Sequence, residues 1–183
     1  MEEIIVDVTV KGTRPLLQND SFGEDGGSSK KGQIYDPEEE SGKRLIKDEK
    51  GKICQKATHF EGCLIKSAAE FKFKGHKTYK ELFKAGVFVE PLLIKHKIPK
   101  YEIDTQQVKI GTARIIRHRP RLDNWELDFT LKILDDRIDA LIAEEVLENA
   151  GKYVGVGDYR PKFGLFEVTK FVKRNGKKKL KRG

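Results

Sequence analysis

Hydrophobic residues recur with a clear period in several segments of the chain. In residues 4–11 they alternate with polar residues, and the β-branched side chains at every second position predict a half-buried β-strand. Residues 164–172 predict a second strand near the end of the sequence. Residues 58–73 and 135–151 instead carry apolar side chains at helical spacing, which predicts two helices that each bury one face.

Short local signals set the expected ends of these elements. Thr58 followed by Glu61 is a capping-box pattern for the first helix, and Gly75 is placed to end it. Residues 78–85 then predict a short helix, and residues 87–89 a brief strand. The later helix has two candidate N-caps and a terminating glycine: Asp135 or Asp136, and Gly151.

A β-hairpin is predicted in the second half of the chain, with residues 107–117 and 124–134 as its arms and residues 118–123 as its turn. The outgoing arm and the turn hold basic side chains with no acid among them: Arg114, Arg117, His118, Arg119 and Arg121. Such a cluster favours an edge that faces an anion. Surface salt bridges to Glu126 and Asp128 are the alternative for some of the arginines.

Residues 18–55 have a different composition, rich in glycine, serine and charged residues and poor in residues that enter a core. A loop of this length in a compact domain is usually functional or disordered, and we expect an irregular arm that orders on a ligand or a neighbour. Within it, residues 44–53 predict a short hairpin that turns at Lys50-Gly51.

A glycine-spaced basic loop joins the later helix to the last strand. Its glycines are Gly155, Gly157 and Gly164, and the residues between them include a candidate nucleic-acid-binding set: Tyr159, Arg160, Lys162 and Phe163. Glycine lets backbone N–H groups approach a phosphate, the cations supply charge, and either aromatic ring offers a stacking surface. The glycine spacing is not a dinucleotide-binding fingerprint, because that fingerprint follows a strand and opens a helix, whereas this loop follows a helix and enters a strand. A plain connection with exposed charges is the alternative.

Composition narrows the class of partner. The 183 residues carry a net charge of +8 with a pI near 9.3, which favours a polyanionic partner. The sequence has no apolar stretch long enough to span a membrane, so we expect a cytoplasmic protein without a membrane partner. Cys54 and Cys63 are expected to be reduced thiols, and neither a metal site nor a cofactor is predicted.

The order of these elements predicts an α+β fold of the ferredoxin-like, RRM-like type, with an antiparallel sheet and two main helices. We expect one domain over residues 1–172, with residues 18–55 inserted after the first strand and a basic, disordered tail over residues 173–183. The aromatic motif of standard RNA-recognition domains does not occur in the sequence.

Three features resemble the RAMP (repeat-associated mysterious protein) superfamily, in particular the backbone subunits of CRISPR effector complexes. They are the glycine-rich loop of residues 155–164, the extended segment that enters the first helix over residues 46–66, and the insertion in the place of the backbone thumb. The resemblance implies a guide-RNA-binding protein, with Lys66 among the contacts. It also implies copies that assemble head-to-tail in a filament with other effector subunits, and a possible contact with the target strand.

We predict a binder rather than an enzyme, with no catalytic residue assigned. In some RAMP backbone subunits a loop aspartate supports cleavage of target RNA, but the aspartates of residues 18–55 give no convincing match. Two alternatives stay open: a general single-strand binding protein for DNA or RNA, and a small endoribonuclease that uses His118 or Asp36.

Overall fold

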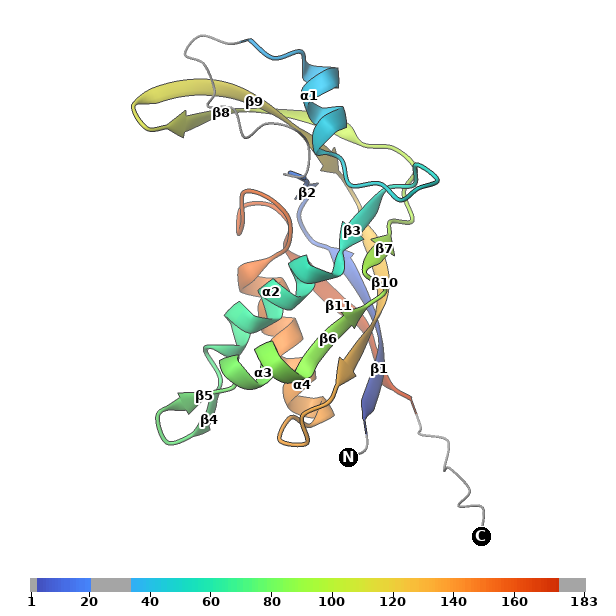
Figure 1. Ribbon diagram of the computed structural model, residues 1–183, viewed down its shortest axis with the longest axis vertical. Helices are drawn as coiled ribbons and strands as arrows, with labels where there is room; N and C mark the ends of the chain where they lie inside the picture. Colours follow the sequence, from blue (N-terminus) through green and yellow to red (C-terminus); the bar gives the residue numbers. More distant parts are fainter. Residues whose placement is uncertain (1–2, 21–33, 175–183) are drawn as a thin grey trace.

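The computed structural model describes residues 3–20 and 34–174. Its centre is a four-stranded antiparallel sheet in the order β11-β1-β10-β6, with two main helices on one face (Figure 1). These elements are β1 Ile4–Gly12, α2 Ala57–Ala68, β6 Val87–Glu90, β10 Glu126–Ile133, α4 Ala140–Asn149 and β11 Phe166–Lys173. The chain therefore runs βαββαβ through the sheet, and the predicted ferredoxin-like α+β fold is confirmed.

The alternation in the first strand has the predicted effect. Val6, Val8 and Val10 are buried in β1, and each lies opposite an apolar residue of β10: Leu131, Phe129 and Leu127, respectively. Because side chains of a strand alternate between faces, the intervening polar residues of β1 lie on the other face of the sheet.

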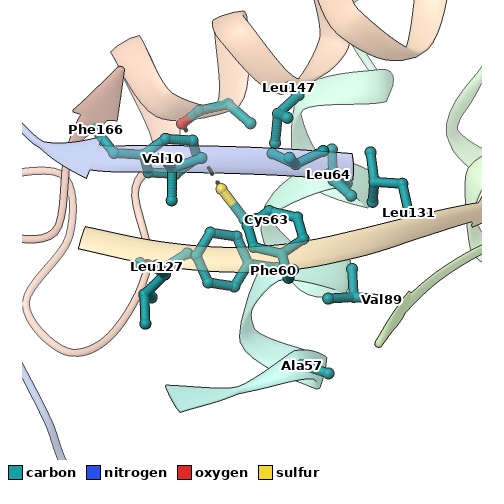
Figure 2. Packing of buried hydrophobic residues seen from close by; sticks show 14 of the residues in the cluster. Val10, Ala57, Phe60, Cys63, Leu64, Val89, Leu127, Leu131, Leu147 and Phe166 are labelled. Atoms are coloured by element: carbon teal, nitrogen blue, oxygen red, sulfur yellow. Dashed lines mark hydrogen bonds between the residues drawn. The ribbon is translucent and has the colours of Figure 1, made fainter. Parts of the chain in front are cut away.

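The core lies between this sheet and the helices (Figure 2). Phe60 and Leu64 of α2 face the sheet, and the rings of Phe60 and Phe129 lie 4.6 Å apart between centroids. The Cys63 thiol donates to the Ala150 carbonyl at 3.7 Å. Burial raises the pKa of this thiol to about 12. Cys63 is therefore a protonated packing residue, and Cys54 is also a free, buried thiol, as expected for reduced cysteines.

The predicted start and end of the first helix are wrong. Helix α2 follows Lys56 without a side-chain cap, and Glu61 accepts instead from the backbone N–H of Val89 at 3.0 Å. That N–H belongs to the edge strand β6, so the carboxylate satisfies a donor that the sheet leaves unpaired. Gly75 has a φ of +58° and turns a small hairpin after the helix, formed by β4 Lys72–Lys74 and β5 Lys77–Thr78. The expected short helix follows as α3 Lys80–Gly86.

The later helix also begins and ends elsewhere than predicted. Its N-cap is Asp139, whose side chain accepts from the Ile142 N–H at 2.8 Å. Asp135 is instead paired with Arg137. The helix continues past Gly151 as a π-helical turn, η1 Ala150–Val154, and this glycine packs against the Phe166 backbone where a Cβ would overlap it.

The predicted hairpin pairs the wrong strands. Strand β8 Glu102–Ile110 turns at Gly111-Thr112 into β9 Ala113–Leu122, so residues 118–122 are strand rather than turn. The chain reverses later, where Asn124 has a φ of +50°. The short β2 Leu16–Leu17 completes this three-stranded sheet, while β10 pairs with β1 and β6. We call β8 and β9 the ribbon; it extends beyond the main sheet (Figure 1).

The described part of the 18–55 insertion is not irregular. It contains α1 Pro37–Arg44, which lies on the ribbon, and β3 Cys54–Lys56, which pairs with β7 Leu93–Lys95 (Figure 1). The predicted turn at Lys50-Gly51 is confirmed, since Lys47 bridges to Ile53 and Gly51 has a φ of +75°. Residues 21–33 of the predicted arm lie outside the described residues.

The last strand reaches into the predicted tail. Lys173 is the last residue of β11, so it belongs to the sheet, and Arg174 just beyond it donates to Asp7 of β1 at 2.6 Å. Residues 175–183 of the predicted tail lie outside the described residues. Within the described part of the chain, every helix is too short or too polar to cross a membrane.

Candidate nucleic-acid interface

The glycine-rich loop, residues 155–164, is shaped by three glycines with left-handed backbone angles. Their φ values are +74° at Gly155, +82° at Gly157 and +77° at Gly164. A Cβ on Gly164 would overlap the Val156 carbonyl, and one on Gly157 would overlap the Leu17 carbonyl. Only glycine combines this φ with so close a backbone approach.

Three backbone N–H groups of this loop donate to carbonyl groups in neighbouring segments. Gly155 donates to Ala150 at 2.8 Å, Asp158 to Leu17 at 2.8 Å, and Gly164 to Pro15 at 2.8 Å. These bonds fasten the loop to η1 and to the start of the ribbon sheet. Those three N–H groups are therefore not available to a phosphate.

The tip of the loop presents one aromatic ring and two cations to solvent. Tyr159 is 52% exposed, whereas Phe163 is 8% exposed and packs beneath it with 5.9 Å between ring centroids. Of the two predicted stacking residues, the structure therefore exposes Tyr159 and buries Phe163. Arg160 and Lys162 are both exposed, and the Lys162 ammonium lies 5.7 Å from the Tyr159 ring centroid.

Cations also lie around α2, from Lys56 just before its start to Lys66 in its last turn. The pKa of His59 is lowered by burial and further by the positive charges of Lys56 and Arg160. Arg160 and Lys66 also act on the Cys63 thiol, where they oppose the rise of its pKa. Two distant stretches, the glycine-rich loop and α2, thus contribute to one positive region.

A buried polar network fixes the geometry below these cations. The Gln18 amide donates to the Cys54 carbonyl at 2.7 Å and to the Gln55 side chain at 2.9 Å, while its oxygen accepts from the Ile46 N–H. The Gln55 amide in turn lies 2.6 Å from His59 Nδ1. Since Gln18 and Gln55 are fully buried, the network holds β2, β3 and α2 in one register.

Two arginines of β9 have internal partners. Glu40 of α1 accepts from Arg117 at 3.1 Å, from Arg119 at 3.3 Å and from the backbone N–H of His118 at 3.0 Å. Arg119 also donates to Asp158 of the glycine-rich loop at 3.2 Å. The salt-bridge alternative is therefore correct for these two arginines, but the partners are Glu40 and Asp158 rather than Glu126 and Asp128.

The other two predicted arginines of the ribbon differ in setting. Arg121 donates to Asp123 at 2.9 Å and lies 3.9 Å from Asp104. Arg114 is exposed next to the ribbon turn, eight residues before the end of β9. The predicted cations therefore divide into exposed ones (Arg160, Lys162, Lys66 and Arg114) and ion-paired ones (Arg117, Arg119 and Arg121).

The open face of the main sheet carries paired charges of both signs. Lys97 pairs with both Glu126 and Asp128, Lys132 pairs with Glu90 at 2.7 Å, and Arg174 pairs with Asp7. Charges so matched do not attract a polyanion.

The candidate residues for RNA cleavage have structural roles. His118 is 7% exposed and its Nδ1 lies 2.9 Å from the Thr105 hydroxyl. Asp36 is the N-cap of α1 and accepts from the Glu39 N–H at 2.8 Å. Neither geometry favours general acid–base chemistry on a bound strand.

Sequence reasoning missed three residues of this region. Lys56 pairs with Asp20 at 2.7 Å beside the start of α2, and Glu40 and Asp158 neutralise arginines of β9. Only Lys56 could have been recognised from the sequence, because it lies just before a predicted helix. The partners of Arg117 and Arg119 lie dozens of residues away and carry no local pattern.

Comparison with known proteins agrees with this architecture. The fold is similar to that of a chain in the cryo-EM structure of the type III-B Cmr-beta bound to cognate target RNA. The present protein superposes on that chain with a TM-score of 0.61 at 12% sequence identity. The match covers 94% of the present chain and 61% of its neighbour, so the present sequence spans less than two thirds of that chain. No family model matches the sequence, and no curated protein matches it significantly.

Proposed function

We propose that this protein binds single-stranded RNA through its phosphate backbone, as a backbone-type subunit of a CRISPR ribonucleoprotein. The observation that carries the proposal is the meeting of the glycine-rich loop with α2. There, Lys162 lies beside one exposed ring, Tyr159, and exposed Arg160 and Lys66 both act on Cys63 of α2, on a fold shared with a chain from an RNA-bound Cmr-beta structure.

The chemistry of this region suits binding to phosphates and base faces. Arginine and lysine bind phosphate oxygens, and a tyrosine ring stacks on any base, because every base has a π-face. The side chains at the loop tip therefore hold a strand without reading its sequence. Guide RNAs differ in sequence from one complex to the next, so a protein that binds them must not depend on their sequence.

The rigid connection of the loop also supports the proposal. Arg119 ties the loop to the ribbon through Asp158, so the loop keeps a fixed relation to the ribbon. A fixed geometry suits repeated copies along one RNA, each holding a short run of nucleotides. Such head-to-tail interfaces between identical subunits form open filaments.

The experiment that tests the proposal is analysis of the nucleic acid that co-purifies with the protein at low salt. We expect RNAs of discrete length in an assembly larger than one chain. A nucleic-acid-free monomer that binds unrelated DNA and RNA strands with equal affinity would instead support a general single-strand binding protein. Turnover of RNA by the purified chain would support the endoribonuclease.

A further inference from the structure

Helix α1 is attached to the ribbon without an apolar face. Its sequence is PEEESGKR, and the residues it buries are Glu40 and Ser41. The Ser41 hydroxyl donates to the Pro37 carbonyl within the helix itself, at 2.7 Å. Most helical stability in proteins comes from packing of an apolar face. The attachment of α1 to β9 therefore includes the buried Glu40 carboxylate, and the Arg117 guanidinium also lies 4.4 Å from the ring centroid of Tyr35, just before the helix.

That carboxylate has the surroundings of a bound oxyanion. Glu40 Oε1 accepts from the guanidinium groups of Arg117 and Arg119, at 3.1 and 3.3 Å, and Oε2 accepts from the His118 N–H at 3.0 Å. Two guanidinium groups and a backbone N–H also make up a common phosphate site. The Glu40 side chain is 5% exposed, so it fills this site completely.

We infer that Glu40 is an internal competitor for RNA phosphate, and that α1 is a displaceable latch over an anion site on β9. In the closed state Arg117 and Arg119 bind Glu40. In the open state a phosphodiester group of the bound strand takes its place, and α1 leaves the ribbon. This inference rests on the proposed RNA binding and adds a second phosphate site to the one at the glycine-rich loop.

The position of the latch supports this assignment. Arg119 already reaches the glycine-rich loop through Asp158, at 3.2 Å, so a strand on the loop passes close to the site on β9. The exposed Glu38 in the first turn of α1 adds negative charge on this side of the ribbon while the latch is closed. RNA that binds at the loop therefore favours the open state.

The direct test compares Glu40→Gln with Glu39→Gln, which removes the same charge from the same helix. Glu39 is 65% exposed on its side chain and pairs with Lys43, so it is a matched control. For an unstructured RNA, Glu40→Gln is expected to tighten binding about fivefold to tenfold and to steepen the slope of affinity against salt by about 1 to 2. Glu39→Gln is expected to change binding less than about twofold, as a remote charge does. Equal effects of the two variants, or weaker binding by Glu40→Gln, would overturn the latch.

A measurement on the unmodified chain guards against a folding defect in Glu40→Gln. Hydrogen exchange of residues 37–44 is expected to become faster when RNA is added, because α1 leaves the ribbon. Unchanged or slower exchange in the bound state would contradict the inference. RNA binding that depends on Arg160 and Lys162 but not on Glu40 would overturn the latch alone, whereas no RNA binding by any variant would overturn the proposed function as well.

Discussion

Arg119 of β9 donates from Nε to Oδ2 of Asp158 in the glycine-rich loop, at 3.2 Å. The same guanidinium donates from Nη1 to Glu40 of α1, at 3.3 Å. One side chain thereby joins the ribbon, the loop and the inserted helix, three segments that are far apart in sequence. Its 15% exposure shields these ion pairs from most of the screening that weakens surface pairs.

Replacement of Arg119 by alanine is expected to destabilise the fold. It leaves Glu40 with one guanidinium partner and takes the Arg119 guanidinium away from Asp158. Removal of one partner from a largely buried pair costs about 2–3 kcal/mol. Denaturant unfolding measures this cost. Arg137→Ala is the control, because the Arg137 side chain is 55% exposed and its partner Asp135 lies two residues away, so the change is expected to cost less than about 1 kcal/mol. Equal destabilisation by the two variants would show that Arg119 does not join the three segments.

The glycine-rich loop is expected to be intolerant of a single methyl group. Gly164→Ala forces alanine to a φ of +77° and drives its Cβ into the Val156 carbonyl, at an expected cost of about 3 kcal/mol. Gly62→Ala is the matched control, since a Cβ there meets nothing within 4 Å and alanine favours the helix by up to about 1 kcal/mol. A thermal shift of the same sign for both variants would contradict this account of the loop.

Acid is expected to destabilise the protein through His96. Neither ring nitrogen of this buried histidine has a hydrogen-bond partner among the described residues, and burial lowers its pKa to about 4. The unfolded chain takes up this proton near pH ~6.5, before the folded chain does. The free energy of unfolding should therefore fall as the pH is lowered from about 6.5 to about 4, by about 3 kcal/mol in total.

His96→Leu is expected to remove that part of the acid dependence, as measured by denaturant unfolding at about pH 7 and about pH 4.5. His76, which is exposed at the turn between β4 and β5, provides the control variant His76→Gln. If the unfolding free energy of His96→Leu fell with pH as steeply as that of the unmodified chain, another group would carry the dependence.

The main sheet could be predicted because its strands obey simple periodic rules. The valines of β1 alternate, and the helices that cover it carry apolar residues at helical spacing, so the order of elements was sufficient for the fold class. The ribbon could not be paired correctly by the same reasoning. Its strands lie outside the main core and have no apolar alternation, and Pro120 within β9 reads locally as a turn signal.

Helix α1 was missed although its start has a readable signal. Asp36 before Pro37, followed by three glutamates, is a capping residue, a first-turn proline and acids at the N-terminus of a helix. The helix was not predicted because it has no apolar residues at helical spacing. Its buried charged residue is Glu40, and burial of a carboxylate depends on arginines that only the fold brings to it.

The site was predicted in part for the same reason. Local spacing indicated the loop and its exposed cations, Arg160 and Lys162, and their binding to RNA stays a prediction. Ion pairs over long separations, such as Glu40 with Arg117, determine which of the remaining arginines are available. No sequence pattern predicts these long-range ion pairs.

The salt dependence of RNA binding tests the central claim most directly. The double variant Arg160→Ala with Lys162→Ala is compared with Lys80→Ala and Lys84→Ala, which removes the same charge from exposed positions on α3. We expect the loop variant to bind every RNA sequence more weakly and to reduce the slope against salt by about 2, because each phosphate that a side chain neutralises adds about 1 to that slope. The α3 variant should keep the slope of the unmodified chain. An unchanged slope for the loop variant would contradict the assignment of the glycine-rich loop as the phosphate-binding site.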